Sequence, residues 1–438
     1  MSEQASRDLE ARIRAHQARV AVLGLGHVGL PLAIEFARAG FPVIGVEADP
    51  RRVACLQAGE SYVTDIAASE IVALVRSGAL QVTEDATVLA EAELVFICVP
   101  TPMSKSREPD LSYVLLATET VRRHLHPGML IILESTTYPG TTEDVLLPQL
   151  QATGLELDRD FYLAFSPERI DPGNRQYRLR DIPKLVGGAS PQSAHLAALA
   201  YRQIIPTVHV VSSARVAEMA KLLENTFRAV NIALVNEFAL ICRAVGVDVW
   251  EVIEAAATKP FGFMPFSPGP GIGGACLPVN PGYLAWKARV HGFEPRLIGV
   301  AEEINRFMPH YAVDLIVEAL NARAKPVKGA RLLMLGVAYK RDVGDVRESP
   351  AVTIIEELLR RGAEVAYSDP YVPRLEIGER VFQSVAVTAE VLAACEGAVI
   401  VTDHTAFDYR LIVEHAPLVV DLRNATRAFG LRANIVRL

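Results

Sequence analysis

Short apolar segments alternate with helical segments along the first half of the chain. The apolar segments are residues 19–23, 42–46, 94–99, 129–133, 161–165 and 208–211. Because their apolar residues follow one another instead of alternating with polar ones, both faces of each predicted strand are expected to be buried. Strands of this kind, separated by helices, are typical of a parallel sheet covered by helices on both faces.

The pattern changes after Ser212. Residues 216–245 contain neither Pro nor Gly, which predicts a single helix about 45 Å long. Further helices are predicted at 248–257 and 297–323, and this region has no strand pattern.

A second α/β block begins at Lys328. Strands are predicted at 329–336, 364–369, 398–401 and 418–421, and a helix at 349–361. Ser349 is the expected N-cap of that helix and Pro350 its first residue. The chain is therefore predicted to be an α/β protein with a tail at 1–18, which is a short amphipathic helix or a frayed end, and parts at 19–211, 212–325 and 326–438.

Composition excludes several classes of protein. Of the 438 residues, 50% are hydrophobic and the net charge is −7, which argues against nonspecific nucleic-acid binding. The five cysteines have no CxxC or Cys/His metal spacing, as expected of a protein from a reducing cytoplasm without a bound metal. No apolar run is long enough to cross a membrane, and the N-terminus lacks a signal peptide.

A glycine turn with a downstream acid carries the first chemical signal. The sequence Gly24-x-Gly26-x-x-Gly29 follows a strand and opens a helix, and Glu47 ends the next strand. This context is typical of a dinucleotide site, where the glycines let the pyrophosphate approach and the acid binds ribose hydroxyls. A carboxylate at that place repels a 2′-phosphate, so NAD is predicted over NADP. The alternative is an ordinary glycine turn of an α/β protein.

Lys221 and Asn225 are four residues apart on the long predicted helix, so they share one face. Glu218 and Arg228 extend the same stripe, and apolar residues flank it. The stripe is either a solvated helix face or a buried polar site, and the spacing does not decide between them.

Two polar segments follow strands, where ligands bind in open α/β sheets. Glu168, in Ser166-Pro-Glu-Arg169, is a candidate base or the ion-pair partner of Arg169. The hydroxyls of Ser135, Thr136 and Thr137 either contact cofactor or water, or cap the next helix.

Cys276 lies in the segment 267–281, whose glycines and prolines exclude a helix or strand. It is either a nucleophile or a buried structural cysteine beside a tight turn. The segment 339–350, from Tyr339 through Lys340 and Arg347, places cations before a helix, and forms either an anion site or a surface charge cluster.

Together these motifs resemble the UDP-glucose/GDP-mannose dehydrogenase family, and they occur in the family's order over residues 19 to about 425. The resemblance implies two Rossmann-like domains, the first binding NAD and the last helping to bind the nucleotide sugar. They are joined by a central helical dimerisation region. It also implies a four-electron oxidation of the sugar C6 alcohol to a carboxylate, in which Cys276 forms a thiohemiacetal and then a thioester.

The resemblance assigns roles by position. The implied catalytic residues are Thr136, Glu168, Lys221, Asn225, Cys276 and Asn280. The implied cofactor-binding residues are Gly24, Gly26, His27, Val28, Gly29, Glu47, Arg52, Thr101, Thr136 and Arg347. The implied substrate-binding residues are Glu168, Arg169, Lys221, Asn225, Gly273, Tyr339 and Lys340.

Within the family, the segments 166–174 and 259–266 and the sequence Cys-Leu-Pro-Val-Asn-Pro are most similar to the UDP-N-acetylglucosamine 6-dehydrogenase branch. The product of such an enzyme is a precursor of surface polysaccharides. The family usually has an aspartate where Asn280 stands, and this branch often has a histidine where Ala275 stands. Asparagine is neither a base nor a counter-ion, so its presence favours the neutral form of Lys221.

Other functions share parts of this pattern. The sugar could instead be that of UDP-glucose or UDP-N-acetylmannosamine. A two-electron β-hydroxyacid-type dehydrogenase has a similar architecture and a helix lysine, but it needs neither Cys276 nor the second α/β block. A non-catalytic nucleotide-sugar-binding or assembly protein could have lost its chemistry through Asn280.

Overall fold

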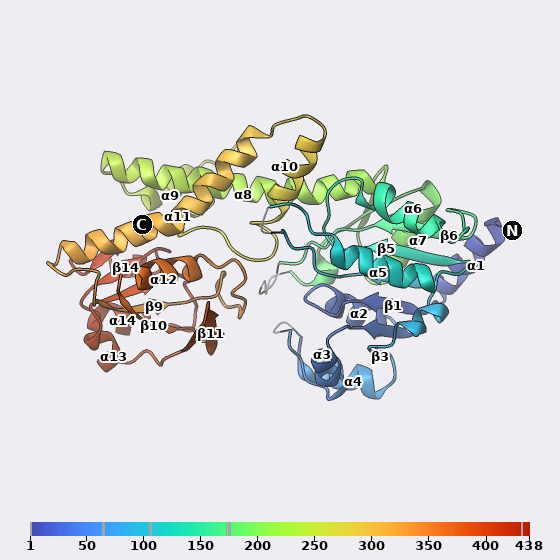
Figure 1. The fold of residues 1–438 in the computed structure, drawn as a ribbon, viewed down its shortest axis with the longest axis horizontal. Helices are drawn as coiled ribbons and strands as arrows, with labels where there is room; N and C mark the ends of the chain where they lie inside the picture. The colour runs from blue at the N-terminus through green and yellow to red at the C-terminus, as the bar shows by residue number, and fades with distance from the viewer. Residues whose placement is uncertain (1, 64–65, 105–106, 172, 174–176, 431) are drawn as a thin grey trace. The chain divides into compact units, whose positions relative to one another are not determined.

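The computed structural model describes all residues except 1, 64–65, 105–106, 172, 174–176 and 431. The chain forms two compact units, one of residues 1–224 and 282–292 and one of residues 225–281 and 293–438. Each unit holds one large sheet with helices on both faces (Figure 1).

The sheet of the first unit has the strand order β3-β2-β1-β4-β5-β6-β7-β8. Its strands are β1 (Val20–Leu23), β2 (Val43–Val46), β3 (Leu80–Thr83), β4 (Leu94–Ile97), β5 (Met129–Leu133), β6 (Phe161–Phe165), β7 (Lys184–Gly188) and β8 (Val208–Val210). Every neighbouring pair in the run β3-β2-β1-β4-β5-β6 is parallel, as expected of the predicted parallel sheet. Strand β7, in contrast, runs antiparallel to β6. Strands β3 and β7 were not predicted, because β3 alternates buried and exposed positions and β7 begins with a lysine and ends in glycines.

Helices cover both faces of this sheet. They are α1 (Ser2–Arg14), α2 (Gly29–Arg38), α3 (Pro50–Gln57), α4 (Ala68–Arg76), α5 (Ser112–Arg123), α6 (Leu147–Gln151) and α7 (Pro191–Arg202), with short turns η1 (Ala86–Glu91), η2 (Thr141–Leu146) and η3 (Leu179–Asp181). Alternate residues of β1 enter opposite cores, Val20 and Val22 on one face and Ala21 and Leu23 on the other. The N-terminal segment is a helix whose Leu9 and Ile13 are buried in the first core, so the amphipathic-helix interpretation is confirmed.

The predicted long helix is α8 (Ala214–Val245), which has 32 residues. It is followed by α9 (Val249–Ala257), α10 (Asn280–Val290) and α11 (Arg296–Asn321). Helix α10 was not predicted because it opens with Asn280-Pro-Gly, a sequence typical of a loop. A proline in the first turn of a helix is nonetheless well tolerated, because its missing N–H has no partner there.

The sheet of the second unit has the order β10-β9-β13-β14-β15 and is parallel throughout. Its elements are β9 (Arg331–Leu335), α12 (Pro350–Arg360), β10 (Glu364–Ser368), α13 (Ala389–Ala394), β13 (Gly397–Ile400), α14 (Tyr409–His415), β14 (Val419–Asp421), η4 (Arg427–Phe429) and β15 (Ile435–Arg437). A separate hairpin of β11 (Arg374–Ile377) and β12 (Arg380–Gln383) was not predicted. The Ser349 hydroxyl accepts from Ala351 N at 3.3 Å, which confirms the predicted cap.

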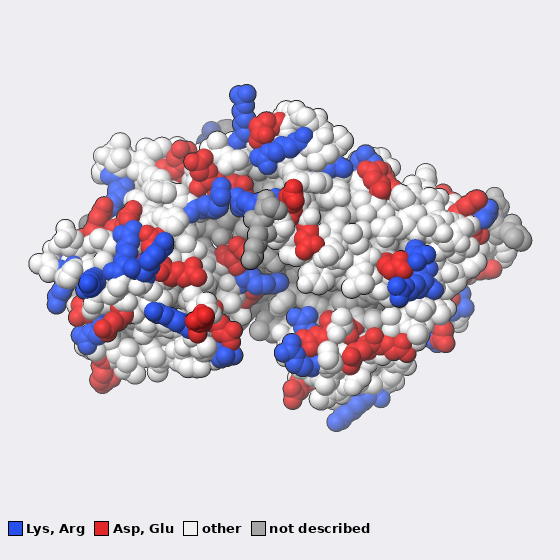
Figure 2. Space-filling model, in the orientation of Figure 1, with Lys and Arg blue, Asp and Glu red and all other residues white. Residues whose placement is uncertain are grey.

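Charged side chains of both signs are interspersed over the face seen in Figure 2. Among the described residues, no helix is long and apolar enough to span a bilayer.

Candidate active site

The predicted site residues are divided between the two units. The first unit contains Gly24, Gly26, His27, Val28, Gly29, Glu47, Arg52, Thr101, Thr136, Glu168, Arg169 and Lys221. The second unit contains Asn225, Gly273, Cys276, Asn280, Tyr339, Lys340 and Arg347.

The glycine turn joins β1 to α2, as the motif predicts. A Cβ on Gly29 would lie 1.9 Å from the carbonyl oxygen of Gly24, and Gly24 itself has φ of +87°. Neither position accepts a side chain. A Cβ on Gly26 would meet nothing within 4 Å, so the turn has open space in front of it. His27 is exposed and Val28 occupies the N-cap of α2.

Glu47 lies at the end of β2, buried beside this turn. One carboxylate oxygen accepts from Leu25 N at 2.9 Å and the other from Asp49 N at 3.1 Å. The guanidinium of Arg52 lies 3.7 Å from the carboxylate and 5.2 Å from the centre of the Tyr62 ring. An acid and a cation therefore flank the turn at the place where a dinucleotide ribose is expected.

The polar stripe of α8 is buried. Glu218, Lys221 and Asn225 are all less than 9% exposed, whereas Arg228 is exposed. The buried-site interpretation is therefore confirmed for the first three residues and wrong for Arg228.

Glu218 binds the turn that follows β5. Its carboxylate accepts from Gly140 N, from Thr142 N at 2.9 Å and from the Thr142 hydroxyl at 2.7 Å. Burial raises the pKa of Glu218 to about 7, although these donors act in the opposite direction.

The loop after β6 is bound to the same helix one turn further on. Arg169 pairs with Glu224 of α8 at 2.7 Å and donates to the Pro183 carbonyl at 2.7 Å. Glu168 is therefore not the partner of Arg169. One of its oxygens accepts from the backbone N of Arg169 at 2.6 Å and of Ile170, and the other lies 3.4 Å from Lys184 Nζ.

The hydroxyls after β5 do not cap a helix. Ser135 donates to the carbonyls of Val99, at 2.8 Å, and Ile97, at 3.2 Å. Thr136 and Thr101 are half-buried. Thr137 Oγ1 is buried without a hydrogen-bond partner among the described residues.

In the second unit, Cys276 is exposed, so the buried-cysteine interpretation is wrong. The loop that carries Cys276 is fixed by hydrogen bonds that its backbone N–H groups donate. Gly269 N donates to Asn236 at 2.9 Å, and Gly274 N donates to the Arg347 carbonyl at 2.9 Å. A Cβ on Gly274, where φ is +88°, would lie 2.8 Å from the Tyr339 ring.

Asn280 is buried at the start of α10. Its backbone N donates to the Cys276 carbonyl at 2.9 Å, and its side-chain oxygen accepts from Nδ2 of Asn225. The long helix and the cysteine loop are therefore joined through two side-chain amides.

The charged segment before α12 is ordered by specific pairs. Arg347 binds Asp345 with 2.6 Å between Nη2 and Oδ2, and Arg341 pairs with Asp403. The hydrogen bonds that Arg347 donates to the Asp345 carboxylate are the chief cause of a raised pKa of Arg347.

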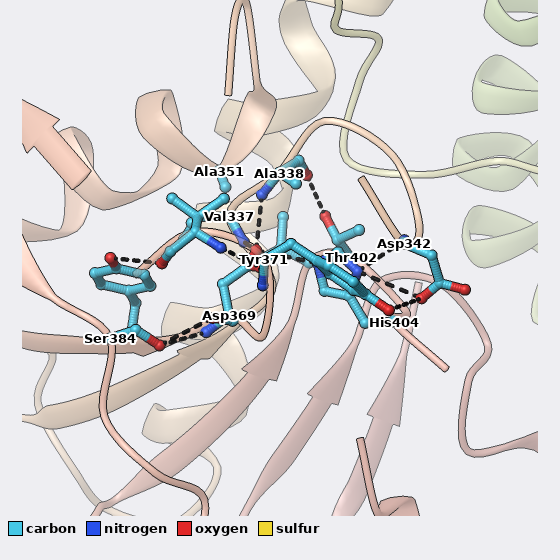
Figure 3. A network of polar contacts seen from close by, with 12 residues as sticks. Val337, Ala338, Asp342, Ala351, Asp369, Tyr371, Ser384, Thr402 and His404 are labelled. Atoms are coloured by element: carbon cyan, nitrogen blue, oxygen red, sulfur yellow. Dashed lines mark hydrogen bonds and ion pairs between the residues drawn. The ribbon is translucent and has the colours of Figure 1, made fainter. Parts of the chain in front are cut away.

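Asp369 and His404 bind the backbone at the start of the segment between β9 and α12 (Figure 3). Asp369 accepts from Val337 N at 2.7 Å, Ala338 N at 3.0 Å and His404 Nε2 at 3.0 Å. The other ring nitrogen of His404 accepts from Asp342 N at 2.9 Å. Asp342, with φ of +58°, in turn accepts from Thr405.

Sequence reasoning missed Arg423, which directly follows β14. Its Nε donates to the Val401 carbonyl at 3.0 Å, and a Cβ on Gly269 would lie 2.4 Å from its Nη1. Burial, and then the neighbouring Arg341, lower the pKa of Arg423 to about 10. The strand-end rule that singled out Glu168 would have found this cation too.

Comparison with known proteins covers all three predicted parts. Profiles of the UDP-glucose/GDP-mannose dehydrogenase family match at residues 18–205 (NAD binding domain), 215–307 (central domain) and 333–428 (UDP binding domain).

Individual proteins agree with these profiles. UDP-N-acetyl-D-glucosamine 6-dehydrogenase of Pseudomonas aeruginosa is 39% identical over 356 residues, which cover 81% of this chain and 83% of that protein. UDP-N-acetyl-D-mannosamine dehydrogenase of Pyrococcus horikoshii is 39% identical over 394 residues, which cover 89% and 90%. A solved structure of UDP-D-ManNAc dehydrogenase from Pyrococcus horikoshii superimposes with a TM-score of 0.87 at 36% identity, covering 96% of this chain and 98% of that one.

The raised pKa of Glu218 predicts a pH-dependent stability. With a pKa of about 7 in place of the ordinary 4.5, folded Glu218 retains a proton that the unfolded chain releases. This contribution to stability is complete below the unfolded value and is lost as the pH rises through the folded one. The unfolding free energy of wild type minus that of Glu218→Gln should therefore fall by about 2–3 kcal/mol from roughly pH 5 to pH 8.

Urea unfolding at each pH measures this difference. Glu143→Gln, on the same turn, removes the same formal charge and is the control. A difference for Glu218→Gln that is constant over this window, or that matches the control, would contradict the prediction.

Proposed function

The chain belongs to the UDP-glucose/GDP-mannose dehydrogenase family, and we propose that it oxidises the C6 alcohol of a UDP-N-acetylhexosamine to the uronic acid. It is an NAD-dependent nucleotide-sugar 6-dehydrogenase. Two relatives at 39% identity, named for UDP-N-acetyl-D-glucosamine and UDP-N-acetyl-D-mannosamine, support the N-acetylated sugar. The product would be made in the cytoplasm and would serve as a precursor of surface polysaccharides.

The residues around the glycine turn fit NAD. The turn excludes side chains at Gly24 and Gly29 and has open space at Gly26, and the N-terminal N–H groups of α2 suit a pyrophosphate. Glu47 and Arg52 would lie beside the ribose. Bound NAD supplies the acceptor for the hydride released at each oxidation.

The exposure of Cys276 carries the covalent part of the proposal. Glu168, or a water that it binds, takes the proton of the C6 hydroxyl in the first oxidation. Cys276 Sγ then bonds to the aldehyde carbon as the thiol proton passes to the aldehyde oxygen, giving a thiohemiacetal. After the second oxidation, water cleaves the C–S bond of the thioester, which releases the carboxylate and a proton and restores the thiol.

Lys221 and Asn225 are suited to stabilise the oxyanion that develops in these steps, because both are buried donors on one helix face. Thr136 would help to hold the hydrolytic water. A two-electron dehydrogenase would need none of the chemistry at Cys276.

Arg423 and Arg341 would bind the diphosphate of the nucleotide sugar. Arg423 approaches Gly269 of the cysteine loop, where only glycine leaves room, and a guanidinium fork suits phosphate oxygens. Tyr339, Lys340 and Gly273 would form the adjoining part of the substrate site.

The enzyme is also proposed to act as a homodimer. Phe227, Leu234, Phe238, Ile241 and Val245 of α8 are each at least 45% exposed and recur at helical spacing. Leu297, Val300 and Phe307 form a second exposed apolar row on α11. Apolar rows of this size are unfavourable in water unless another surface covers them.

A panel of UDP-sugars tests the reaction. The expected result is two NADH and one uronic acid per sugar with UDP-N-acetylglucosamine or UDP-N-acetylmannosamine, and much slower turnover of UDP-glucose. NADH absorbance and product mass are the measurements. A protein that forms one NADH per sugar, or none with any sugar, would refute the proposal.

Cys276→Ser should lower formation of the uronic acid by on the order of 10³-fold or more, because the covalent intermediate is lost. Cys55→Ser replaces a half-buried cysteine of α3 and should retain wild-type turnover. Unchanged formation of the final product by Cys276→Ser would favour the two-electron alternative.

Sedimentation velocity of the full chain should give the mass of a dimer. Phe238→Asp, which places a charge within the apolar row of α8, should shift the protein toward the monomer mass. A wild-type monomer at micromolar concentration would contradict the proposed assembly.

A further inference from the structure

A buried group of charges lies behind Glu168 and is not used by the proposed chemistry. Lys184, Glu134 and Glu168 are 2%, 1% and 8% exposed. The Nζ of Lys184 lies 2.7 Å from Glu134 Oε2 and 3.4 Å from Glu168 Oε2. One ammonium thus bridges two carboxylates inside the first unit.

Lys184 lies beside Glu168 because β7 runs antiparallel to β6. Ala164 of β6 pairs with Gly188 of β7, and Phe165 pairs with Gly187, in antiparallel register. Extending that register by four residues places Lys184 opposite Glu168. Because β7 starts where β6 ends, its first residue reaches the edge of the sheet where the parallel strands end.

The remaining residues of the group contact Lys184 or Glu134 and not Glu168. Tyr201 of α7 donates its hydroxyl to Glu134 Oε1, and the Lys184 ammonium lies 5.0 Å from the centre of the Tyr201 ring. Cys98, the other titratable neighbour, is also buried. Of the five groups, only Glu168 belongs to the predicted catalytic residues.

Such a group is costly for folding. Buried ion pairs often contribute less to stability than apolar residues of similar volume, because each charge loses its hydration. A role in setting the state of Glu168 explains why three charges are placed here. Burial raises the pKa of Glu134 to about 7, whereas the Lys184 ammonium acts in the opposite direction.

We propose that Lys184 is a positioning residue that keeps Glu168 ionised and fixes the direction of its carboxylate. Backbone N–H groups of Arg169 and Ile170 bind one oxygen and Lys184 binds the other. The carboxylate therefore cannot rotate without losing a charge-assisted contact. The catalytic use of Glu168 rests on the proposed function, whereas its ionisation by Lys184 does not.

Infrared difference spectra of the unliganded protein test the ionisation directly. Subtracting spectra of Glu168→Gln isolates the carboxylate band of Glu168 at each pH. In Lys184→Met the band should appear at a higher pH than in wild type, because the neighbouring cation is gone, and Lys184→Arg should restore the wild-type position. An unchanged band position in Lys184→Met would overturn the proposal.

Kinetics provide the second readout. In Lys184→Met, kcat should fall by about 10- to 100-fold at neutral pH, KM for both substrates should change little, and the acidic limb of the kcat–pH profile should move to higher pH. Lys184→Arg should recover most of the activity. A purely structural role would lower the amount of folded enzyme without moving this limb, and that result would also overturn the proposal.

Two other results, misfolding of Lys184→Met and a wild type that oxidises no UDP-sugar, still leave the role of Lys184 testable. If Lys184→Met does not fold, Lys184→Met/Glu134→Gln removes the ammonium together with its closest carboxylate and carries the same expectations. If wild type oxidises no UDP-sugar, the proposed function fails, and the infrared result alone then supports or overturns the role of Lys184.

Discussion

The polar face of α8 is the constraint on which the loops at one edge of the first unit's sheet depend. An unpaired polar group inside a protein costs several kcal/mol, so each polar side chain on that face must be met by a partner. Buried Glu218 accepts from the backbone of the turn after β5, and half-buried Glu224 of the same helix pairs with Arg169 of the loop after β6. Lys221 lies between these two anchors, and the loops that follow adjacent strands are thereby fixed on both sides of it.

The two α/β units each have a carboxylate directly after the second strand of the glycine turn's strand pair, and the two carboxylates bind different partners. Glu47 ends β2 and binds the N–H that follows Gly24; Asp369 follows β10 and binds the N–H that follows Gly336. Asp369 also accepts from Ala338, Tyr371, Val372 and His404, so its two oxygens take five donors. Among the described residues, Glu47 accepts from two backbone N–H groups, with Arg52 nearby. The first acid therefore retains acceptor capacity for a ribose, whereas the second is committed to shaping its own loop.

Local signals explain what could be predicted. The long helix was predictable because α8 contains no Gly or Pro, and the Ser349 cap because capping depends on neighbouring residues. Lys184 and the reversal of β7 were not, because a lysine after Pro183 is typical of a surface turn and the direction of a strand depends on its tertiary neighbours. The buried state of Glu218 and the exposure of Cys276 likewise depend on contacts between residues far apart in sequence.

Because residue 280 is an asparagine, the proposed reaction depends more strongly on the buried group of Lys184, Glu134 and Glu168. The side-chain oxygen of Asn280 accepts from Asn225 as a carboxylate oxygen would, so the hydrogen bond is preserved while the charge is removed. At a position only 2% exposed, an amide also avoids the desolvation that a carboxylate would suffer. Glu168 is then the one carboxylate among the predicted catalytic residues. In the proposed reaction, proton transfer from the substrate passes through it or through a water that it binds. Under the proposed function, Glu168 and the lysine beside it supply what an acid at 280 would otherwise share.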